Sequence, residues 1–192
     1  MLIDQWKEKR RYIKQYDASA YIYNLRYREE QSKKYEMALK SLSMLYSDRI
    51  LDVGCGTGLF ILKISKFGKT IVGIDCSKKM LNEAKKKCSH LLNVSLICSD
   101  ADFLPLRENS FNLVFAFTLL QNMPNPEKTL HEILRVANID STVILTAQKK
   151  AFTKFRFMQL LGKIDLYLIH FIATEELKDY LAICRRRRNQ KK

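Results

Sequence analysis

Residues 51–58 read LDVGCGTG, and an acidic residue, Asp75, closes the next apolar run along the chain. The stretch has the pattern of a buried strand that ends in a carboxylate, Asp52, and opens into a turn with three alternating glycines. Glycine lets a backbone pass close to a ligand because it has no Cβ. An acid at the end of the following strand can offer two oxygens to a ribose diol. The pattern therefore predicts a nucleoside-type ligand between the turn and Asp75.

The glycine spacing argues against a dinucleotide cofactor. The dinucleotide fingerprint Gly-x-Gly-x-x-Gly needs its third glycine where this chain has Leu59, and Gly58 comes one residue early. A carboxylate at Asp52 is also unusual beside a doubly charged pyrophosphate, and it suits a cation better. A nicotinamide enzyme is therefore the third-ranked alternative.

The run from Leu51 to Gly58 resembles motif I of the class I S-adenosylmethionine-dependent methyltransferases, in the type 11 and ubiquinone-menaquinone biosynthesis branch. The ligand of that family carries a sulfonium and an ammonium instead of phosphates. The resemblance implies S-adenosyl-L-methionine as the cofactor. The residues that it assigns to cofactor binding in this part of the chain are Asp52, Gly54, Cys55, Gly56, Gly58, Asp75 and Cys76.

A second block, residues 93–117, resembles the part of the family in which an acid and a small residue after the third strand hold the adenine. Asp100 and Ala101 occupy those places. The resemblance gives Asp100 the adenine amine and Ala101 a backbone contact to the ring, with Asp102 as the competing choice for the acid. Phe117, at the end of the fourth predicted strand, completes the expected cofactor site.

A pattern near the N-terminus, formed by Tyr16, Asp17, Ala20 and Tyr23, also resembles this branch. In such relatives the N-terminal segment folds over the cofactor as a lid. An aromatic ring there can shield a sulfonium through a cation–π attraction of roughly 0.5–2 kcal/mol, and Tyr23 is the first candidate. The alternative is that the tyrosines only pack a helical hairpin.

The catalytic residues stay unknown at this level. Methyl transfer from a sulfonium depends mainly on alignment, and a base is needed only for an acceptor with a tightly held proton. His131 and His170 are the two candidates for such a base, with a structural role as the alternative. Gln121 and Asn122 stand where the pocket should open, and they either orient a ligand or cap a loop.

The composition indicates one catalytic domain. The chain has 192 residues and 47% hydrophobic content, which allows one substantial core. No stretch approaches the roughly eighteen apolar residues of a membrane span, so a soluble, cytoplasmic protein is expected. The five cysteines lack a Cys-x-x-Cys pair and the histidines lack ligand spacing, which predicts reduced thiols and no metal site.

The net charge of +14 is large for this length. Basic residues gather in the tail 185–192 and in the N-terminal segment 7–14, and they could contact RNA or an anionic membrane surface. A solvated surface without a partner is an equal alternative to RNA, and a membrane ranks below both. A partner subunit or a dimer also stays open.

The order of elements predicts an α/β fold, a Rossmann-like doubly wound and mainly parallel sheet with helices on both faces. Helices are expected over 1–14 and about 28–45, and a further capped helix from Thr174. The sheet either ends short near the C-terminus or gains Leu166 to Ile172 as an edge strand. The expected strands are 49–53, 70–75, 94–98, 112–117 and 142–147, and the helices between them are 57–67, 77–88 and 126–138.

These features divide the chain into a helical lid, 1–48, a cofactor-binding core, 49–150, a helical substrate-side segment, 151–184, and a basic tail, 185–192. The function expected from the resemblance is in-line methyl transfer from S-adenosyl-L-methionine to RNA or to a small or lipid-like molecule. The alternative is a catalytically silent, methyltransferase-like binding module or partner subunit.

Overall fold

The computed structural model describes residues 2–42 and 47–187. Helices and strands alternate along most of the chain, as the glycine turn and the apolar runs predict. The elements are α1 (Leu2–Ser19), η1 (Ala20–Ile22), α2 (Tyr23–Ser41), β1 (Ser47–Val53), α3 (Leu59–Ile64), β2 (Gly68–Asp75), α4 (Lys78–Cys88), β3 (Val94–Cys98), β4 (Phe111–Ala116), η2 (Leu120–Asn122), α5 (Pro126–Val136), β5 (Ala137–Gln148), α6 (Lys154–Gly162), β6 (Leu166–Ile172) and β7 (Asp179–Arg186).

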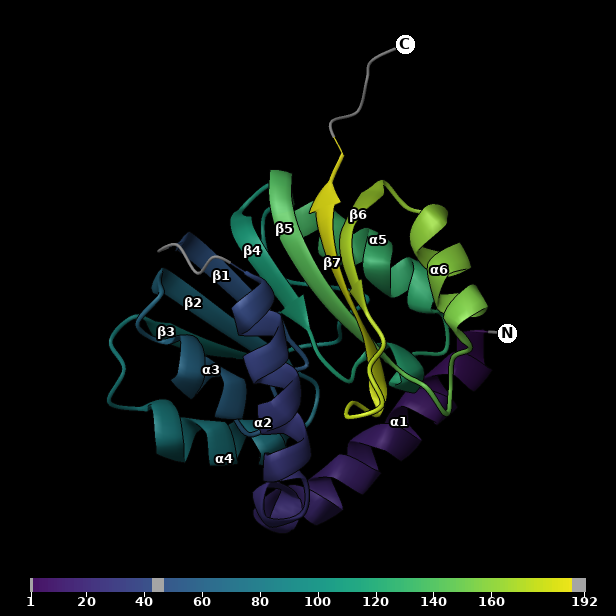
Figure 1. The fold of residues 1–192 in the computed structure, drawn as a ribbon. Coiled ribbons are helices and arrows are strands. Elements are labelled where there is room, and N and C mark those ends of the chain that lie inside the picture. Colours follow the sequence, from purple (N-terminus) through teal and green to yellow (C-terminus); the bar gives the residue numbers. More distant parts are fainter. Residues whose placement is uncertain (1, 43–46, 188–192) are drawn as a thin grey trace.

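The strands form one seven-stranded sheet in the order β3-β2-β1-β4-β5-β7-β6 (Figure 1). Strands β1 to β5 pair in parallel, and β7 runs antiparallel to both β5 and β6. The predicted Rossmann-like sheet is confirmed. Its strand order reverses between β1 and β4, and a parallel sheet binds ligands at such a point, beyond the carboxyl ends of its strands.

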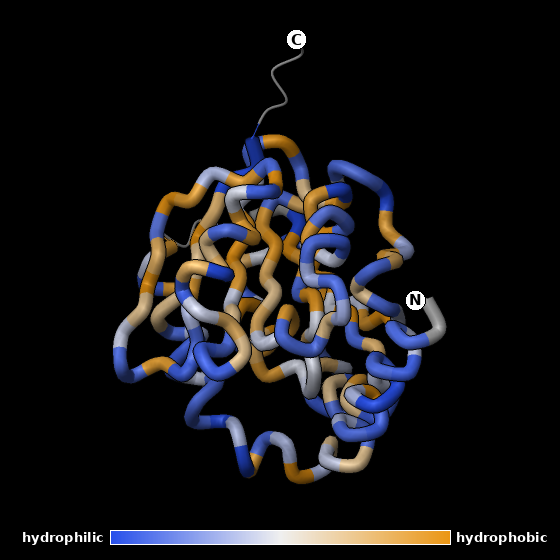
Figure 2. The backbone as a smooth tube through the Cα atoms, turned by 90° about the vertical axis from the view of Figure 1, so that its right-hand side faces the viewer, coloured by the Kyte–Doolittle hydropathy of each residue, from blue (hydrophilic) through white to orange (hydrophobic). Residues whose placement is uncertain are grey.

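Two hydrophobic clusters fix the sheet between its helices. Residues of α2, α3 and α4 pack with one face, and residues of α5 and α6 pack with the other. Figure 2 shows hydrophobic residues along the central strands and hydrophilic ones along the outer helices. Helix α5 begins as expected, because the Asn125 side chain accepts a hydrogen bond from the Lys128 amide and Pro126 takes the first turn.

The N-terminal helices are longer than the periodicity predicts. Helix α1 extends to Ser19, and η1 and α2 then continue the chain to Ser41, while residues 43–46 of the expected second helix lie outside the described residues. Helix α1 runs along the edge of the sheet where the parallel strands end (Figure 1). Helix α1 therefore covers the edge at which parallel sheets generally bind their ligands.

The C-terminal expectations need correction. The sheet is not short, since β6 forms its edge and β7 fills the place between β5 and β6. Thr174 begins only a turn rather than a helix. Segment 151–184 is therefore not mainly helical, because it supplies α6, β6 and most of β7 to the same sheet. Arg185 and Arg186 belong to β7, while residues 188–192 of the basic tail lie outside the described residues.

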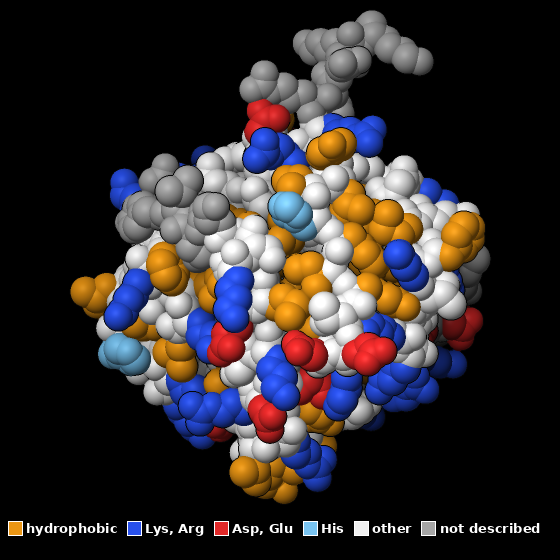
Figure 3. Space-filling view, viewed as in Figure 1, with side chains coloured by type: hydrophobic (Ala, Val, Ile, Leu, Met, Phe, Trp, Pro, Cys, Tyr) orange, Lys and Arg blue, Asp and Glu red, His pale blue; other side chains and the backbone are white. Residues whose placement is uncertain are grey.

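Within the described part of the chain, every helix is too short or too polar to cross a lipid bilayer. The five cysteines are all free. In the view of Figure 3, basic side chains are spread over the surface and mixed with acidic ones in its lower half. This face therefore presents no single basic patch.

Candidate functional site

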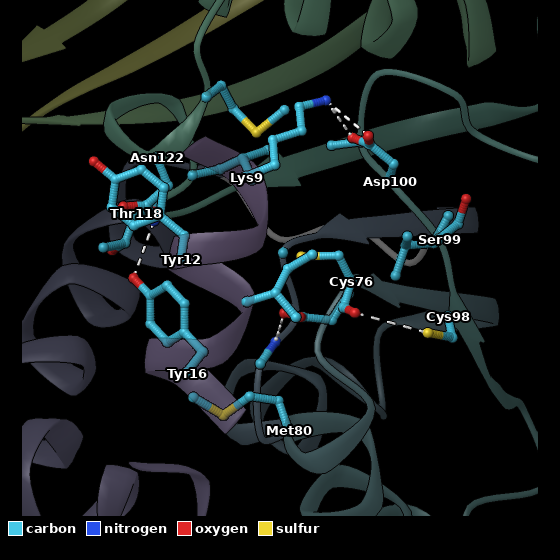
Figure 4. Close-up of a pocket in the computed structure, with 18 of the residues that line it drawn as sticks. Lys9, Tyr12, Tyr16, Cys76, Met80, Cys98, Ser99, Asp100, Thr118 and Asn122 are labelled. Carbon is cyan, nitrogen blue, oxygen red and sulfur yellow. Dashed lines mark hydrogen bonds and ion pairs between the residues drawn. The ribbon is translucent and has the colours of Figure 1, made fainter. Parts of the chain in front are cut away.

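A cavity of about 280 Å³ lies at the carboxyl ends of the parallel strands, under helix α1 (Figure 4). Its walls come from α1, from the glycine turn and from the segments that follow β2, β3 and β4. The lining residues are Trp6, Lys9, Tyr12, Ile13, Tyr16, Tyr23, Gly54, Gly56, Ile74, Asp75, Cys76, Met80, Cys98, Ser99, Asp100, Ala101, Phe117, Thr118, Leu119, Asn122 and Met123.

The three glycines of the turn have two different roles. Gly54 and Gly56 line the cavity with positive φ angles of 80° and 53°, and a Cβ added at Gly56 would meet no atom within 4 Å. Gly58 does not line the cavity. A Cβ there would lie 3.1 Å from both Ala84 Cβ and Cys88 Sγ, so Gly58 allows α3 to pack against α4.

Asp75 is fixed beside this turn. Its Oδ2 accepts a hydrogen bond of 2.9 Å from the Gly56 amide, and its Oδ1 accepts one of 2.8 Å from the Ser77 amide. Burial raises the pKa of Asp75, and the two amide donors oppose that rise. The carboxylate is thus held in one orientation at the cavity wall.

Five further predicted cofactor residues line the same cavity: Cys76, Asp100, Ala101, Phe117 and Tyr23. The surrounding cavity wall partly desolvates the Cys76 thiol, and this desolvation, with the charges of Asp75 and Asp100, raises its pKa to about 12. A thiol that holds its proton so firmly is a poor nucleophile. Cys76 therefore shapes the wall and is unsuited to covalent chemistry.

The remaining two predicted residues lie beneath the lining. Asp52 and Cys55 are 2% and 7% exposed, and neither side chain reaches the cavity surface. Cys55 packs in the cluster formed by α2, α3 and α4. A contact from either residue to a ligand stays a prediction.

Comparison with known proteins gives the family. The sequence profile of the family described as "Methyltransferase domain" matches residues 51–145, the stretch that contains the glycine turn, Asp75 and Asp100. The chain belongs to the class I S-adenosylmethionine-dependent methyltransferases. S-adenosyl-L-methionine is the cofactor of this family, in agreement with the resemblance of motif I.

Two curated methyltransferases illustrate the similarity. Malonyl-[acyl-carrier protein] O-methyltransferase of Marinomonas sp. is 32% identical over 140 residues, covering 72% of this chain and 52% of that protein. Demethylmenaquinone methyltransferase of Staphylococcus saprophyticus is 34% identical over 111 residues, covering 56% of this chain and 48% of that protein. The chain spans about half the length of the curated relatives it matches.

A solved methyltransferase structure shares the fold. N-methyltransferase NodS from Bradyrhizobium japonicum, in complex with S-adenosyl-l-homocysteine, superposes with a TM-score of 0.77 at 16% identity, over 93% of this chain and 98% of that chain. At this identity the likeness concerns the fold alone.

Tyr16 and Asp17 anchor α1 on both sides of the cavity. Asp17 Oδ1 accepts a hydrogen bond of 2.5 Å from Ser77 Oγ and one of 3.2 Å from the Lys79 amide at the start of α4. Tyr16 Oη accepts a hydrogen bond of 3.0 Å from Asn122 Nδ2 (Figure 4). Helix α1 is thereby tied to the segments after β2 and after β4.

A second cavity, of about 580 Å³, adjoins the first. The two cavities lie side by side, because five residues line both: Tyr12, Tyr16, Tyr23, Thr118 and Asn122. The other residues that line the second cavity are Gln15, Ser19, Tyr27, Glu30, Gln31, Gln121, Gln148, Lys149, Lys150, Ala151 and Lys178.

Gln121 and Asn122 cap a loop, which is one of the two roles that the sequence leaves open, and their contact with a ligand stays a prediction. Their side-chain amides donate hydrogen bonds of 2.7 and 3.1 Å to the Thr118 carbonyl, which caps the loop after β4. Both also line the second cavity, and Gln121 Oε1 is buried with no hydrogen-bond partner among the described residues. His131 and His170 are exposed and line neither cavity.

Sequence reasoning placed Tyr16 in a segment that covers the cofactor, but it missed the other residues that α1 contributes. Trp6, Lys9, Tyr12, Ile13 and Tyr16 all line the first cavity. Their spacing of three to four residues places them on one helix face. That periodicity is visible in the sequence. The charged residues between these positions, however, favoured the interpretation of segment 7–14 as a basic surface. Among the described residues, no group of three or more potential ligands could hold a metal ion.

The burial of Asp52 leads to a testable pH dependence. Burial, reinforced by the charge of Asp75, raises the pKa of Asp52 to about 8 in the folded protein, whereas an unfolded aspartate titrates near about 3.9. Between these values the folded state holds one more proton than the unfolded state. The free energy of unfolding should therefore fall as pH rises through this window, by up to about 1.4 kcal/mol per pH unit.

The variant Asp52→Asn removes this titration, so its stability relative to the unchanged protein should rise from about pH 4 to about pH 8 and then level off. Urea unfolding followed by circular dichroism across this range measures the difference. Parallel pH profiles for the two proteins would contradict the assignment.

Proposed function

We propose that this chain transfers a methyl group from S-adenosyl-L-methionine to a small organic acceptor. The observation that carries the proposal is the fixed carboxylate of Asp75 at the wall of a cavity that shares five lining residues with a second, adjacent cavity. The first cavity suits the cofactor and the second suits an acceptor. Their shared walls would bring donor and acceptor together, which is the main requirement of an in-line displacement.

The residues of the first cavity fit the cofactor. Asp75 would accept hydrogen bonds from the ribose hydroxyls, and Asp100 would accept one from the adenine amine. Gly54 and Gly56 leave room for the ligand beside the turn, and the ring of Tyr23 is available to a cation. When bound, the cofactor supplies a methyl group on a sulfonium, which is a good leaving group.

Among the described residues that line the second cavity there is no histidine, and the one carboxylate is that of Glu30. Burial raises the pKa of both Tyr16 and Tyr23, so neither phenol readily gives up or takes a proton near neutral pH. Glu30, the carboxylate in that wall, is paired with Lys178 at 2.6 Å. These facts support an acceptor that is already nucleophilic, such as an ionised oxygen or an activated ring carbon.

The tyrosine rings and side-chain amides of the second cavity suit a flat, partly apolar molecule with polar groups. The names of the two curated relatives point to a demethylated menaquinone and to malonyl-[acyl-carrier protein] as their acceptors. A quinone-like ring is the acceptor class that we favour for this chain. RNA is the second candidate, because the net charge is +14.

Incubation with a methyl-labelled donor tests the proposal. Total RNA, total protein and an extract of small molecules and lipids are offered separately, and we expect label in the extract. Label in RNA alone, with binding that weakens steeply as salt rises, would overturn the small-molecule acceptor. Titration with S-adenosylhomocysteine accompanies the assay, and binding without labelling of any fraction would favour the silent binding module instead.

A further inference from the structure

Lys9 of α1 reaches across the cofactor cavity to two carboxylates. Its Nζ lies 2.8 Å from Asp100 Oδ1 and 2.7 Å from Asp100 Oδ2, and 2.5 Å from Asp102 Oδ2 (Figure 4 shows the contacts to Asp100). The side chains of Lys9, Asp100 and Asp102 are 10%, 16% and 3% exposed. This cluster joins residues that are 91 and 93 positions apart in the sequence.

The cluster is built to keep the lysine in place. Asp102 is buried, and its other oxygen, Oδ1, accepts a hydrogen bond of 2.5 Å from Thr129 Oγ1, which is itself fully buried. If Lys9 left, two neighbouring carboxylates would remain in a poorly hydrated place with no cation. Removing one partner from a buried ion pair is strongly unfavourable. The ammonium of Lys9 should therefore stay with Asp102 when a ligand enters.

Asp100 still has a free hydrogen-bond acceptor position for a ligand while it is paired with Lys9. A carboxylate has about four acceptor positions. Three are used, two by Lys9 Nζ and one on Oδ1 by the Asp102 amide at 3.0 Å. The remaining position is on Oδ2, and Asp100 lines the cavity. One donor, such as an exocyclic amine, can therefore bind Asp100 without displacing the lysine.

We propose that Lys9 is a positioning residue of the cofactor site, which offsets one of the two negative charges of Asp100 and Asp102 and holds Asp100 ready for the adenine amine. This inference rests on the proposed function, because it takes Asp100 as the acceptor of that amine. It also makes α1 part of adenine recognition, since the lysine that completes the site comes from the lid helix. Adenine binding and docking of α1 are then coupled.

A charge-compensation cycle tests the proposal. S-adenosylhomocysteine is titrated into the unchanged protein, Lys9→Met, Asp102→Asn and the double variant. Lys9→Met should weaken binding by about tenfold or more, because two carboxylates then share the site without a cation. The double variant has a single carboxylate, Asp100, and so the same excess of one negative charge as the unchanged protein, and the amide oxygen that replaces the Asp102 carboxylate would keep the contact with Thr129. Its affinity should therefore return to within about threefold of that of Asp102→Asn.

A second ligand separates positioning from general damage to the fold. S-inosylhomocysteine lacks the exocyclic amine, so Lys9→Met should weaken its binding much less than that of S-adenosylhomocysteine. Equal losses for the two ligands, or no recovery in the double variant, would overturn the proposal. Tighter binding of S-adenosylhomocysteine by Lys9→Met would also overturn it, by showing that the lysine competes with adenine. Failure of the unchanged protein to bind S-adenosylhomocysteine would instead overturn the proposed function, and the inference with it.

Discussion

Replacing Lys34 by methionine is expected to lower the free energy of unfolding by about 3–5 kcal/mol. Lys34 of α2 places its Nζ 2.6 Å from Asp179 Oδ2 at the start of β7, and the two side chains are 1% and 0% exposed. Asp179 has no further hydrogen-bond partner for its carboxylate among the described residues. Without the lysine, a fully buried carboxylate would remain uncompensated, and that is the source of the loss.

A matched double variant, Lys34→Met with Asp179→Leu, separates the orphaned charge from the lost packing. Apolar residues of similar size in place of a buried ion pair are often neutral or stabilising, so the double variant should recover most of the stability. Urea unfolding of all three proteins, followed by circular dichroism, gives the comparison. A loss below about 1 kcal/mol in the single variant would show that the pair contributes no more than a surface salt bridge.

The same lysine also touches the site. Lys34 Nζ donates a hydrogen bond of 2.7 Å to Thr118 Oγ1, and Thr118 lines both cavities with a positive φ angle of 55°. A non-glycine residue in this conformation is held there by its surroundings. The buried pair therefore links the N-terminal helices, the last strand and the loop after β4.

Replacing Asp75 by alanine is expected to weaken binding of S-adenosylhomocysteine by at least about 100-fold. Two hydrogen bonds from a ribose diol to a carboxylate are each worth about 1.5–3 kcal/mol, and both would be lost. The change also removes the acceptor for the Gly56 and Ser77 amides, so the glycine turn and the start of α4 lose an anchor. Isothermal titration calorimetry measures the affinity.

Asp165→Ala is the matched control for this prediction, since Asp165 is an exposed aspartate that lines neither cavity. Its affinity should equal that of the unchanged protein. If Asp75→Ala bound the ligand within about threefold of the unchanged protein while remaining folded, Asp75 would not contact the ribose, and the orientation of the cofactor would need revision.

Local patterns in the sequence were sufficient for the central part of the fold. The alternation of apolar runs with a glycine turn and helix caps predicts the parallel strands, because each of these signals lies within a few residues of its effect. The same local signals predict that Asp75 and Asp100 follow neighbouring strands. The carboxyl ends of parallel strands meet at one edge of the sheet, so both acids line one cavity.

The C-terminal part shows where local signals fail. Residues from Thr174 carry a helix-capping pattern and the chain continues into an arginine run, yet the structure has a turn followed by β7. Strand β7 pairs antiparallel with β5 and β6, and those hydrogen bonds come from strands on both sides rather than from adjacent residues. Tertiary pairing overrides local propensity in such cases.

By itself, then, the sequence determined the doubly wound sheet, the glycine turn and the acids at the strand ends, since these depend on short-range periodicity and on residue types with one strong conformational preference. Only the tertiary structure decided that Lys9 meets Asp100 and Asp102, and that Lys34 meets Asp179. From the sequence alone, a lysine on a helix is predicted to lie on the surface, whichever residue it pairs with in the folded protein. Whether such a lysine is buried depends on whether the fold places a distant carboxylate next to it. Burial of an unpaired charge is too unfavourable, so buried charges are paired with opposite ones.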